Sequence, residues 1–277
     1  MTEAMENKRY RWTSAAAKRI LKLAGDPRTV EEAVQVVATR LLQGVPCPPT
    51  DLEALKYGLS VNSFEAIPDL PISGELRKDG DGFKVVYSAR LSPGRKRFTI
   101  AHELGHAIFE TTGPNCPRYG NELERICDML AAELLLPRKI FAAHIGSDIG
   151  PVRIYELARD FETSVMATAL RCFHLFGISV FQVENANVAW GYGVVRQQRD
   201  MRPDMSGFQA AITQAMDGIP GEASVLLRGS AQVLRWVGTP GQRRALFVLQ
   251  PRKRATGAGM CEVRRHSSIS ALDAGCR

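Results

Sequence analysis

Two histidines four residues apart constrain this chain more than any other feature. His102 and His106 enclose Glu103 in a largely apolar run that begins at Phe98. On an α-helix, residues four positions apart lie one above the other on the same face. Both imidazoles can then reach one Zn²⁺ ion, at the usual distance of about 2.0–2.1 Å. The segment therefore predicts a helix that carries two metal ligands, His102 and His106.

Glu103 follows the first histidine directly, so its carboxylate can take a proton from a metal-activated water and pass it to a leaving amine. A His-Glu-x-x-His pattern arises by chance in roughly one chain in a hundred of this length, and two buried structural histidines are the alternative interpretation. Small residues such as Ala101 and Gly105 would let a second helix approach closely. The candidate catalytic residue is Glu103.

A catalytic zinc site needs a third protein ligand and a position for water. On the helix expected at Asn121–Leu136, Glu124 and Asp128 share one face, whereas Glu133 lies on the opposite face. We predict Glu124 as the third ligand and Asp128 as the residue that orients a ligand histidine through its second ring nitrogen. His144 is an alternative ligand.

The stretch Arg97–His106, followed by Glu124-x-x-Cys-Asp-x-x-Ala-Ala-Glu-Leu-Leu-Leu-Pro137, resembles the ImmA/IrrE family of metallopeptidases. The resemblance covers residues 28–180. In that family the first Glu of the second motif is the third zinc ligand, and this position is Glu124 here. Cys127 and Asp128 depart from the Ala and Asn that are typical of the family, and a leucine replaces the aromatic residue two positions later.

The resemblance implies a cytoplasmic zinc endopeptidase, with one catalytic Zn²⁺. Its substrate would be a partner protein, commonly a helix-turn-helix DNA-binding repressor, whose cleavage relieves repression in a stress or mobile-element response. A strand beside the active-site helix, within 72–76 or 83–88, would hold the extended substrate by β-addition. Tyr87, Tyr119 and Tyr155 are candidates for stabilising the oxyanion.

The expected fold class is α+β: a zincin-like peptidase domain with an active-site helix, a small β-sheet and a helical second half, then a small α/β C-terminal domain. We expect a leader helix in 1–27, the peptidase domain at 28–180, the C-terminal domain at 181–252 and a basic, disordered tail at 253–277.

Periodicity and turn signals predict the helices and strands of these parts. The expected elements are helices Ser14–Leu23, Thr29–Leu42, Asp51–Tyr57, Asn121–Leu136, Pro151–Phe161, Ser164–Leu175 and Phe208–Met216, a hairpin within Ile72–Ser88, and strands between Ile178 and Leu249.

The composition fits a cytoplasmic globular protein. The 277 residues are 45% hydrophobic and 23% charged, which excludes a disordered or collagen-like chain. The N-terminus has no apolar core of a signal peptide, and no apolar run is long enough for a membrane span. Six cysteines without a CxxC pair indicate reduced thiols. The net charge is +7, and much of it lies in the tail, which we expect to be solvated rather than bound to nucleic acid.

The sequence leaves three other functions to consider: DNA binding, a non-catalytic role and small-molecule binding. The pair of helices at 152–176 has helix-turn-helix lengths, but the second offers only Arg171 and His174 to DNA, so we expect no direct nucleic-acid binding. The chain could instead be a non-catalytic regulatory or toxin–antitoxin partner, with the metal serving only the fold. Trp190–Gly193 and Trp236 could line a small-molecule pocket. The sequence leaves the substrate, the inducing signal and the oligomeric state open.

Overall fold

The computed structural model describes residues 11–111, 120–146, 149–195, 207–227, 230–239 and 241–251, and these form a mixed α+β structure. Polar side chains cap the first three helices, because Ser14, Thr29 and Asp51 each accept a hydrogen bond from a backbone N–H of the first turn. These helices are α1 (Ala15–Ala24), α2 (Val30–Leu41) and α3 (Leu52–Tyr57).

Helix α1, expected as a leader, packs into the main core. Its Ala16 and Ile20 are buried in the same apolar cluster as residues of α2 and α5 (Asn121–Leu135). The Glu122 carboxylate at the start of α5 also accepts a hydrogen bond of 2.9 Å from the Ser14 backbone N–H. The first helix is therefore joined to α5 by both apolar contact and hydrogen bonding.

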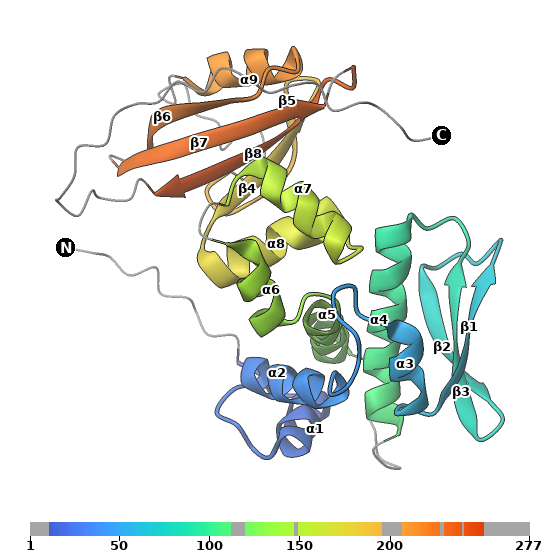
Figure 1. Ribbon diagram of the computed structural model, residues 1–277. Helices are drawn as coiled ribbons and strands as arrows, with labels where there is room; N and C mark the ends of the chain where they lie inside the picture. The colour runs from blue at the N-terminus through green and yellow to red at the C-terminus, as the bar shows by residue number, and fades with distance from the viewer. Residues whose placement is uncertain are drawn as a thin grey trace.

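A three-stranded sheet lies beside helix α4 (Pro93–Glu110), which carries the His-Glu-x-x-His pattern (Figure 1). Strand β2 (Gly74–Asp79) forms the expected antiparallel hairpin with β3 (Gly82–Ser88), and β1 (Val61–Ile67) pairs with β3 in parallel. The strand order is β1-β3-β2, so β2 is an edge strand and β3 is central. Of the two strands considered for substrate pairing, 83–88 is excluded, because β3 is already paired on both sides.

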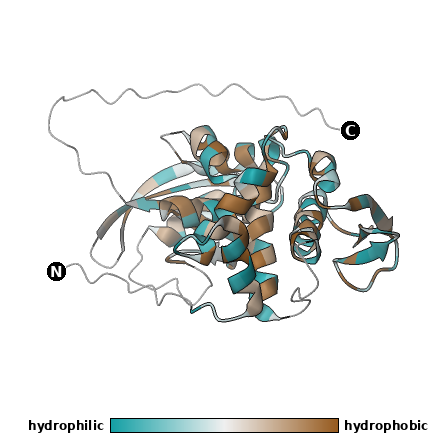
Figure 2. Cartoon of the chain, turned by 90° about the horizontal axis from the view of Figure 1, so that it is seen from below, coloured by the Kyte–Doolittle hydropathy of each residue, from teal (hydrophilic) through white to brown (hydrophobic). Residues whose placement is uncertain are grey.

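Three helices link this region to the rest of the chain: α6 (Arg138–Ile145), α7 (Pro151–Asp160) and α8 (Val165–Phe176). The sequence pattern predicts no helix between Pro137 and Pro151, yet α6 begins directly after Pro137. Proline is compatible with a helix start, because the backbone N–H it lacks would have no partner there. Around the helices, hydrophilic and hydrophobic residues occupy different faces (Figure 2), as expected where one face is buried.

The C-terminal sheet has five antiparallel strands in the order β5-β4-β8-β7-β6. Helix α9 (Phe208–Met216) covers one face, and α7 and α8 cover the other (Figure 1). Neighbouring residues therefore enter different cores: Val180 packs with the helices of the first part, and Phe181 packs under α9. The strands are β4 (Ser179–Glu184), β5 (Asn187–Tyr192), β6 (Gly221–Leu227), β7 (Ser230–Thr239) and β8 (Arg244–Pro251).

The described residues bear on the expectations about membrane spans, cysteines and the domain boundary. No helix in the described part of the chain is long and apolar enough to span a membrane. Cys47, Cys127 and Cys172 form no disulfide within the described residues. The tail at 253–277 and the other three cysteines lie outside the described residues. The sheet begins at Ser179, two residues before the expected domain boundary.

Candidate active site

A cleft of about 530 Å³ lies between β2, α4 and α5, and its lining includes the three predicted metal ligands, Glu103 and Asp128. Helix α4 contributes His102, Glu103 and His106 to the cleft, and the first half of α5 contributes Glu124 and Asp128. Gly74 and Leu76 line the opposite side, on the edge strand β2. The tertiary fold thus brings together residues from two helices and one strand.

The three proposed ligands lie close enough together to share one metal ion, because one donor atom from each lies within 4.8 Å of the other two. His102 Nε2 lies 3.2 Å from His106 Nε2 and 3.3 Å from Glu124 Oε2, and His106 Nε2 lies 3.5 Å from Glu124 Oε1. Ligand atoms about 2.0–2.1 Å from a tetrahedral zinc ion are separated from each other by about 3.3–3.4 Å. Two imidazole nitrogens and a carboxylate oxygen are also a donor set found in catalytic zinc sites. The residues present therefore fit a zinc ion.

Asp128 sets the proton position on the first histidine. Its Oδ1 lies 2.9 Å from His102 Nδ1. A carboxylate only accepts hydrogen bonds, so the proton of a neutral His102 belongs on Nδ1, and the lone pair of Nε2 points toward His106 and Glu124. This is the arrangement in which a carboxylate orients a metal-binding histidine and increases its basicity.

The two histidines have opposite pKa shifts. Burial lowers the pKa of His102, but the hydrogen bond that it donates to Asp128 and the charges of Glu103, Asp128 and Glu124 outweigh burial and raise the pKa above the ordinary value. Burial and the neighbouring charge of His102 lower the pKa of His106. Two imidazole nitrogens 3.2 Å apart favour one shared positive charge, because two facing lone pairs repel each other.

Glu103 is buried between α4 and the edge strand, with 7% of its surface exposed. Burial raises the pKa of its carboxyl to about 7, and Glu124 adds to the increase. His102 and a hydrogen bond donated by the Leu76 backbone N–H act in the opposite direction. A carboxyl with a pKa near neutrality can both accept and release a proton under physiological conditions.

Glycines allow the close packing that forms the cleft. A Cβ atom on Gly105 would lie 3.2 Å from both Cα and Cβ of Cys127, so α4 and α5 approach at this point more closely than a side chain allows. A Cβ atom on Gly74 would lie 2.3 Å from Thr99 Cγ2, so β2 also lies directly against α4. Cys127 is buried at the helix contact, as a small apolar side chain would be.

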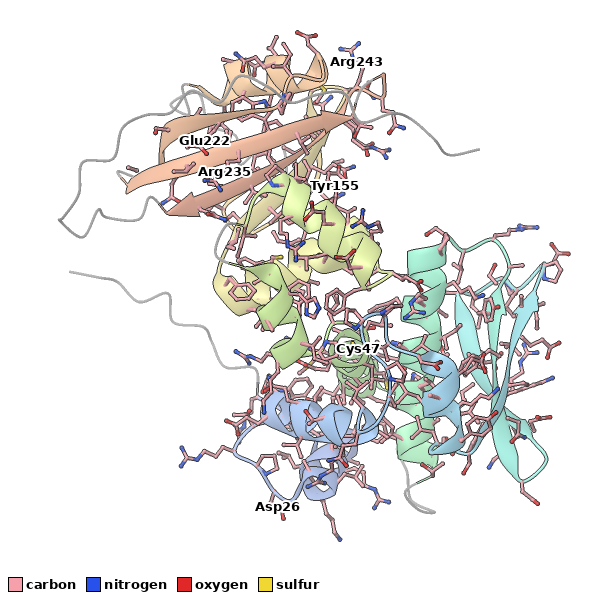
Figure 3. All side chains as sticks on the ribbon, viewed as in Figure 1. Asp26, Cys47, Tyr155, Glu222, Arg235 and Arg243 are labelled. Atoms are coloured by element: carbon pink, nitrogen blue, oxygen red, sulfur yellow. The ribbon has the colours of Figure 1, made fainter. Side chains whose placement is uncertain are left out.

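The described candidates for oxyanion stabilisation lie away from the cleft. Tyr155 is on α7 beside the C-terminal sheet, where its hydroxyl bonds to Thr239 (Figure 3). Tyr87 is buried in β3, with Lys96 Nζ 4.9 Å from its ring centre. Tyr119 lies outside the described residues. Neither Tyr87 nor Tyr155 is among the residues that line the cleft.

Other sequence candidates also lie elsewhere. His144 Nδ1 is 2.8 Å from the Ile140 carbonyl oxygen, one helical turn away on α6. Trp190 packs against the first core, whereas Trp236 is buried under α9, so the two tryptophans are on opposite faces of the sheet and do not share a pocket.

Sequence reasoning missed one buried ion pair. Arg171 Nη2 lies 2.7 Å from Glu133 Oε2, and about a tenth or less of each side chain is exposed. The only signal was that Glu133 faces away from Glu124 on α5. The pair joins α5 to α8 and removes Arg171 from the polar surface that a DNA-reading helix would need.

With this geometry in place, the comparison with protein families becomes informative. Residues 75–173, which include both histidines and Glu124, match a known family model. This segment is similar to Peptidase_M78, the IrrE N-terminal-like domain. The expected ImmA/IrrE resemblance is therefore confirmed for these residues. The match to this family suggests that the segment is a metallopeptidase domain.

Other comparisons add less. No curated protein matches the chain. Among solved structures, a chain described as a Mycobacterium tuberculosis transcriptional regulator is 16% identical, with a TM-score of 0.42. The alignment covers 89% of this chain and 92% of that chain. A similarity at this level establishes no shared function.

Proposed function

We propose that this chain is a zinc-dependent endopeptidase that hydrolyses a peptide bond in a partner protein. The observation that carries the proposal is the cluster of donor atoms from His102, His106 and Glu124, all within 4.8 Å of one another, beside the buried carboxyl of Glu103. These residues lie within the segment that matches a peptidase family, which supports the same chemistry.

His102, His106 and Glu124 would hold the metal, and Asp128 would keep His102 in the tautomer that leaves Nε2 free. Bound zinc would supply Lewis-acid polarisation of the scissile carbonyl and would acidify a water molecule. Glu103 would accept the proton of the attacking water on its carboxylate and then donate it to the leaving amine nitrogen. Its burial excludes bulk water from that proton.

The edge strand would hold the substrate in an extended conformation. Leu76 directs its backbone N–H toward Glu103 rather than toward β3, so alternate residues of β2 present their backbone groups to the cleft. A substrate strand can add to such an edge through backbone hydrogen bonds, which depend little on sequence. We infer that the substrate is a cytoplasmic protein of the DNA-binding repressor class, since such repressors are the usual targets in the ImmA/IrrE family.

Replacement of Glu103 tests this function directly. Glu103→Gln should keep the metal ligands and lose the proton acceptor, so zinc content should equal that of the wild type while the cleavage rate falls by about 10²–10⁴-fold. The substrate is a proteome-derived peptide library, with zinc content measured by elemental analysis. Glu65→Gln on β1, whose carboxylate pairs with Lys84, is the matched control and should behave as wild type.

Cleavage by Glu103→Gln at the wild-type rate, or no cleavage by any zinc-loaded form, would contradict the enzyme proposal. The second result would favour the non-catalytic regulatory or toxin–antitoxin hypothesis. A DNA-binding regulator gains no support from the structure, because Arg171, one of the two side chains it would use, is buried against Glu133.

A further inference from the structure

A second cavity of about 540 Å³ adjoins the metal cleft. One face of α5 forms its floor, and residues of α2 and α8 form its sides. Phe98 and Asp128 line both cavities, so the two cavities adjoin at these side chains. Most of the exposed lining is apolar, including Val34, Met129, Ala132 and Leu170.

One pair of opposite charges lies on the floor of the second cavity. Arg171 and Glu133 both line it, and their side chains form the buried ion pair of 2.7 Å. The Glu133 carboxylate also accepts a hydrogen bond from the Arg138 backbone N–H, whereas Arg171 Nε is buried without a hydrogen-bond partner among the described residues. An apolar occupant would therefore leave the charges of this pair compensated by each other.

The entrance to the second cavity is close to the metal ligands. Phe98 precedes His102 by one helical turn, and Asp128 follows Glu124 by one turn. The ring centres of Phe98 and His102 are 6.4 Å apart. Because an extended chain advances about 3.3 Å per residue, a side chain one or two positions from the scissile bond would reach this entrance.

The direction of β2 indicates on which side of the scissile bond that residue lies. Gly74 lies against Thr99, and the Leu76 N–H reaches Glu103, so β2 and α4 run in the same direction. Antiparallel pairing is the more stable mode of strand addition, and it places the C-terminal part of the substrate toward the N-terminal end of α4. Phe98 and Gly94 line the second cavity at that end.

We propose that the second cavity is the specificity pocket of the peptidase, and that it takes a large apolar side chain one or two residues C-terminal to the scissile bond. The inference rests on the proposed function, because it assumes that a substrate occupies the metal cleft. The occupant follows from the shared lining of the two adjoining cavities, the apolar lining of the second and the orientation of β2.

A variant that fills the cavity tests the inference. Ala132 is half-buried on the floor of the cavity, so Ala132→Phe should occupy the space that the substrate side chain needs. With the zinc-loaded wild type and a proteome-derived peptide library, cleavage sites should be enriched in Leu, Met or Phe at the first two positions after the cut. Ala132→Phe should reduce that preference about tenfold or more, in the range expected for a hydrophobic pocket. Ala142→Phe, on an exposed position of α6, is the matched control.

A binding measurement and a second variant keep the test independent of catalysis and folding. The inactive, zinc-loaded Glu103→Gln protein should bind a fluorescent peptide that contains Phe more tightly than its Ala counterpart, and the addition of Ala132→Phe should remove the difference. Ala167→Phe narrows the cavity from α8 and should have the same effect if Ala132→Phe does not fold. Wild-type zinc content shows that each variant keeps the metal site.

The outcomes separate the two proposals. If the wild type cuts nothing beyond the Glu103→Gln background, the enzyme function fails. If it cuts without an apolar preference, prefers apolar residues only before the cut, or keeps its preference in both filled variants, the pocket assignment is wrong. A small molecule that co-purifies with the wild type and is absent from Ala132→Phe would assign the cavity to a ligand instead, and would also overturn the inference.

Discussion

Asp128 affects the proposed metal ligands through a single hydrogen bond. Its carboxylate, four residues after Glu124, accepts from His102 Nδ1 at 2.9 Å and leaves Nε2 free for the ion. A carboxylate at this position carries a full negative charge, whereas the asparagine usual in the ImmA/IrrE family would provide only a neutral acceptor. The charge should make the histidine a stronger donor to the metal.

Substitution of Asp128 should therefore weaken zinc binding, by an amount that depends on the residue introduced. Asp128→Asn keeps an oxygen acceptor and should raise the Kd for zinc modestly, whereas Asp128→Ala removes the hydrogen bond and should raise it by about 10–100-fold. Competition with a chelating dye measures both values. Asp69→Ala, which removes an exposed carboxylate paired with Arg90, should leave the Kd unchanged. A wild-type Kd in Asp128→Ala would show that the hydrogen bond does not support the metal site.

At the scale of elements, the site depends on how closely α4 and α5 approach. The two histidines are placed by one helix, but Glu124 reaches them only because Gly105 lets Cys127 come within contact of the α4 backbone. On the other side of α4, Gly74 has the same effect for β2. The close packing of α5 and of β2 against α4 thus depends on two positions that have no side chain.

Gly105→Ala should show this dependence. Alanine gains up to about 1 kcal/mol of helix propensity over glycine, but its Cβ would lie 3.2 Å from Cα of Cys127, a backbone atom that cannot rotate away. Overpacking typically costs about 1–3 kcal/mol, so we expect net destabilisation and weaker zinc binding, measured by urea unfolding and chelator competition.

Gly58→Ala is the control for Gly105→Ala. Gly58 ends α3 with ordinary helical dihedral angles, and the nearest atom to its added Cβ would be 3.8 Å away. Its free energy of unfolding should stay within about 0.5 kcal/mol of the wild type. Equal stability and zinc affinity in both glycine variants would mean that α5 can move without disturbing the site.

At the scale of the whole molecule, the C-terminal sheet and the helical region share a core. Val180, Leu246 and Val248 pack in the same apolar cluster as residues of α4 and α5. Strand β4 lies between β5 and β8, so a cut at residue 180 would divide an interior strand. The expected division into 28–180 and 181–252 therefore crosses a continuous packing unit.

We expect the full chain to unfold in one cooperative transition, with calorimetric and van't Hoff enthalpies that agree. A fragment that ends at residue 180 should fail to fold, because the faces of α7 and α8 that cover the sheet would be exposed to water. Scanning calorimetry of the full chain and circular dichroism of the fragment are the measurements. Two separate transitions, or a fragment that folds and binds zinc, would show that the two parts are independent domains.

Local patterns in the sequence determined the helices, the hairpin and the composition of the donor set. Caps such as Ser14 and Thr29, and four-residue spacings such as His102 to His106 and Glu124 to Asp128, act within one element. Their consequences follow from the 3.6-residue helical period without knowledge of the rest of the chain.

Only the tertiary structure decided how the elements meet. It selected β2 as the free edge beside α4, paired Asp128 with His102, buried Arg171 against Glu133 and put Trp190 and Trp236 on opposite faces of one sheet. It also opened a second cavity beside the metal cleft. These contacts join residues far apart in sequence, and they depend on packing between elements, which the period of any single helix or strand does not specify.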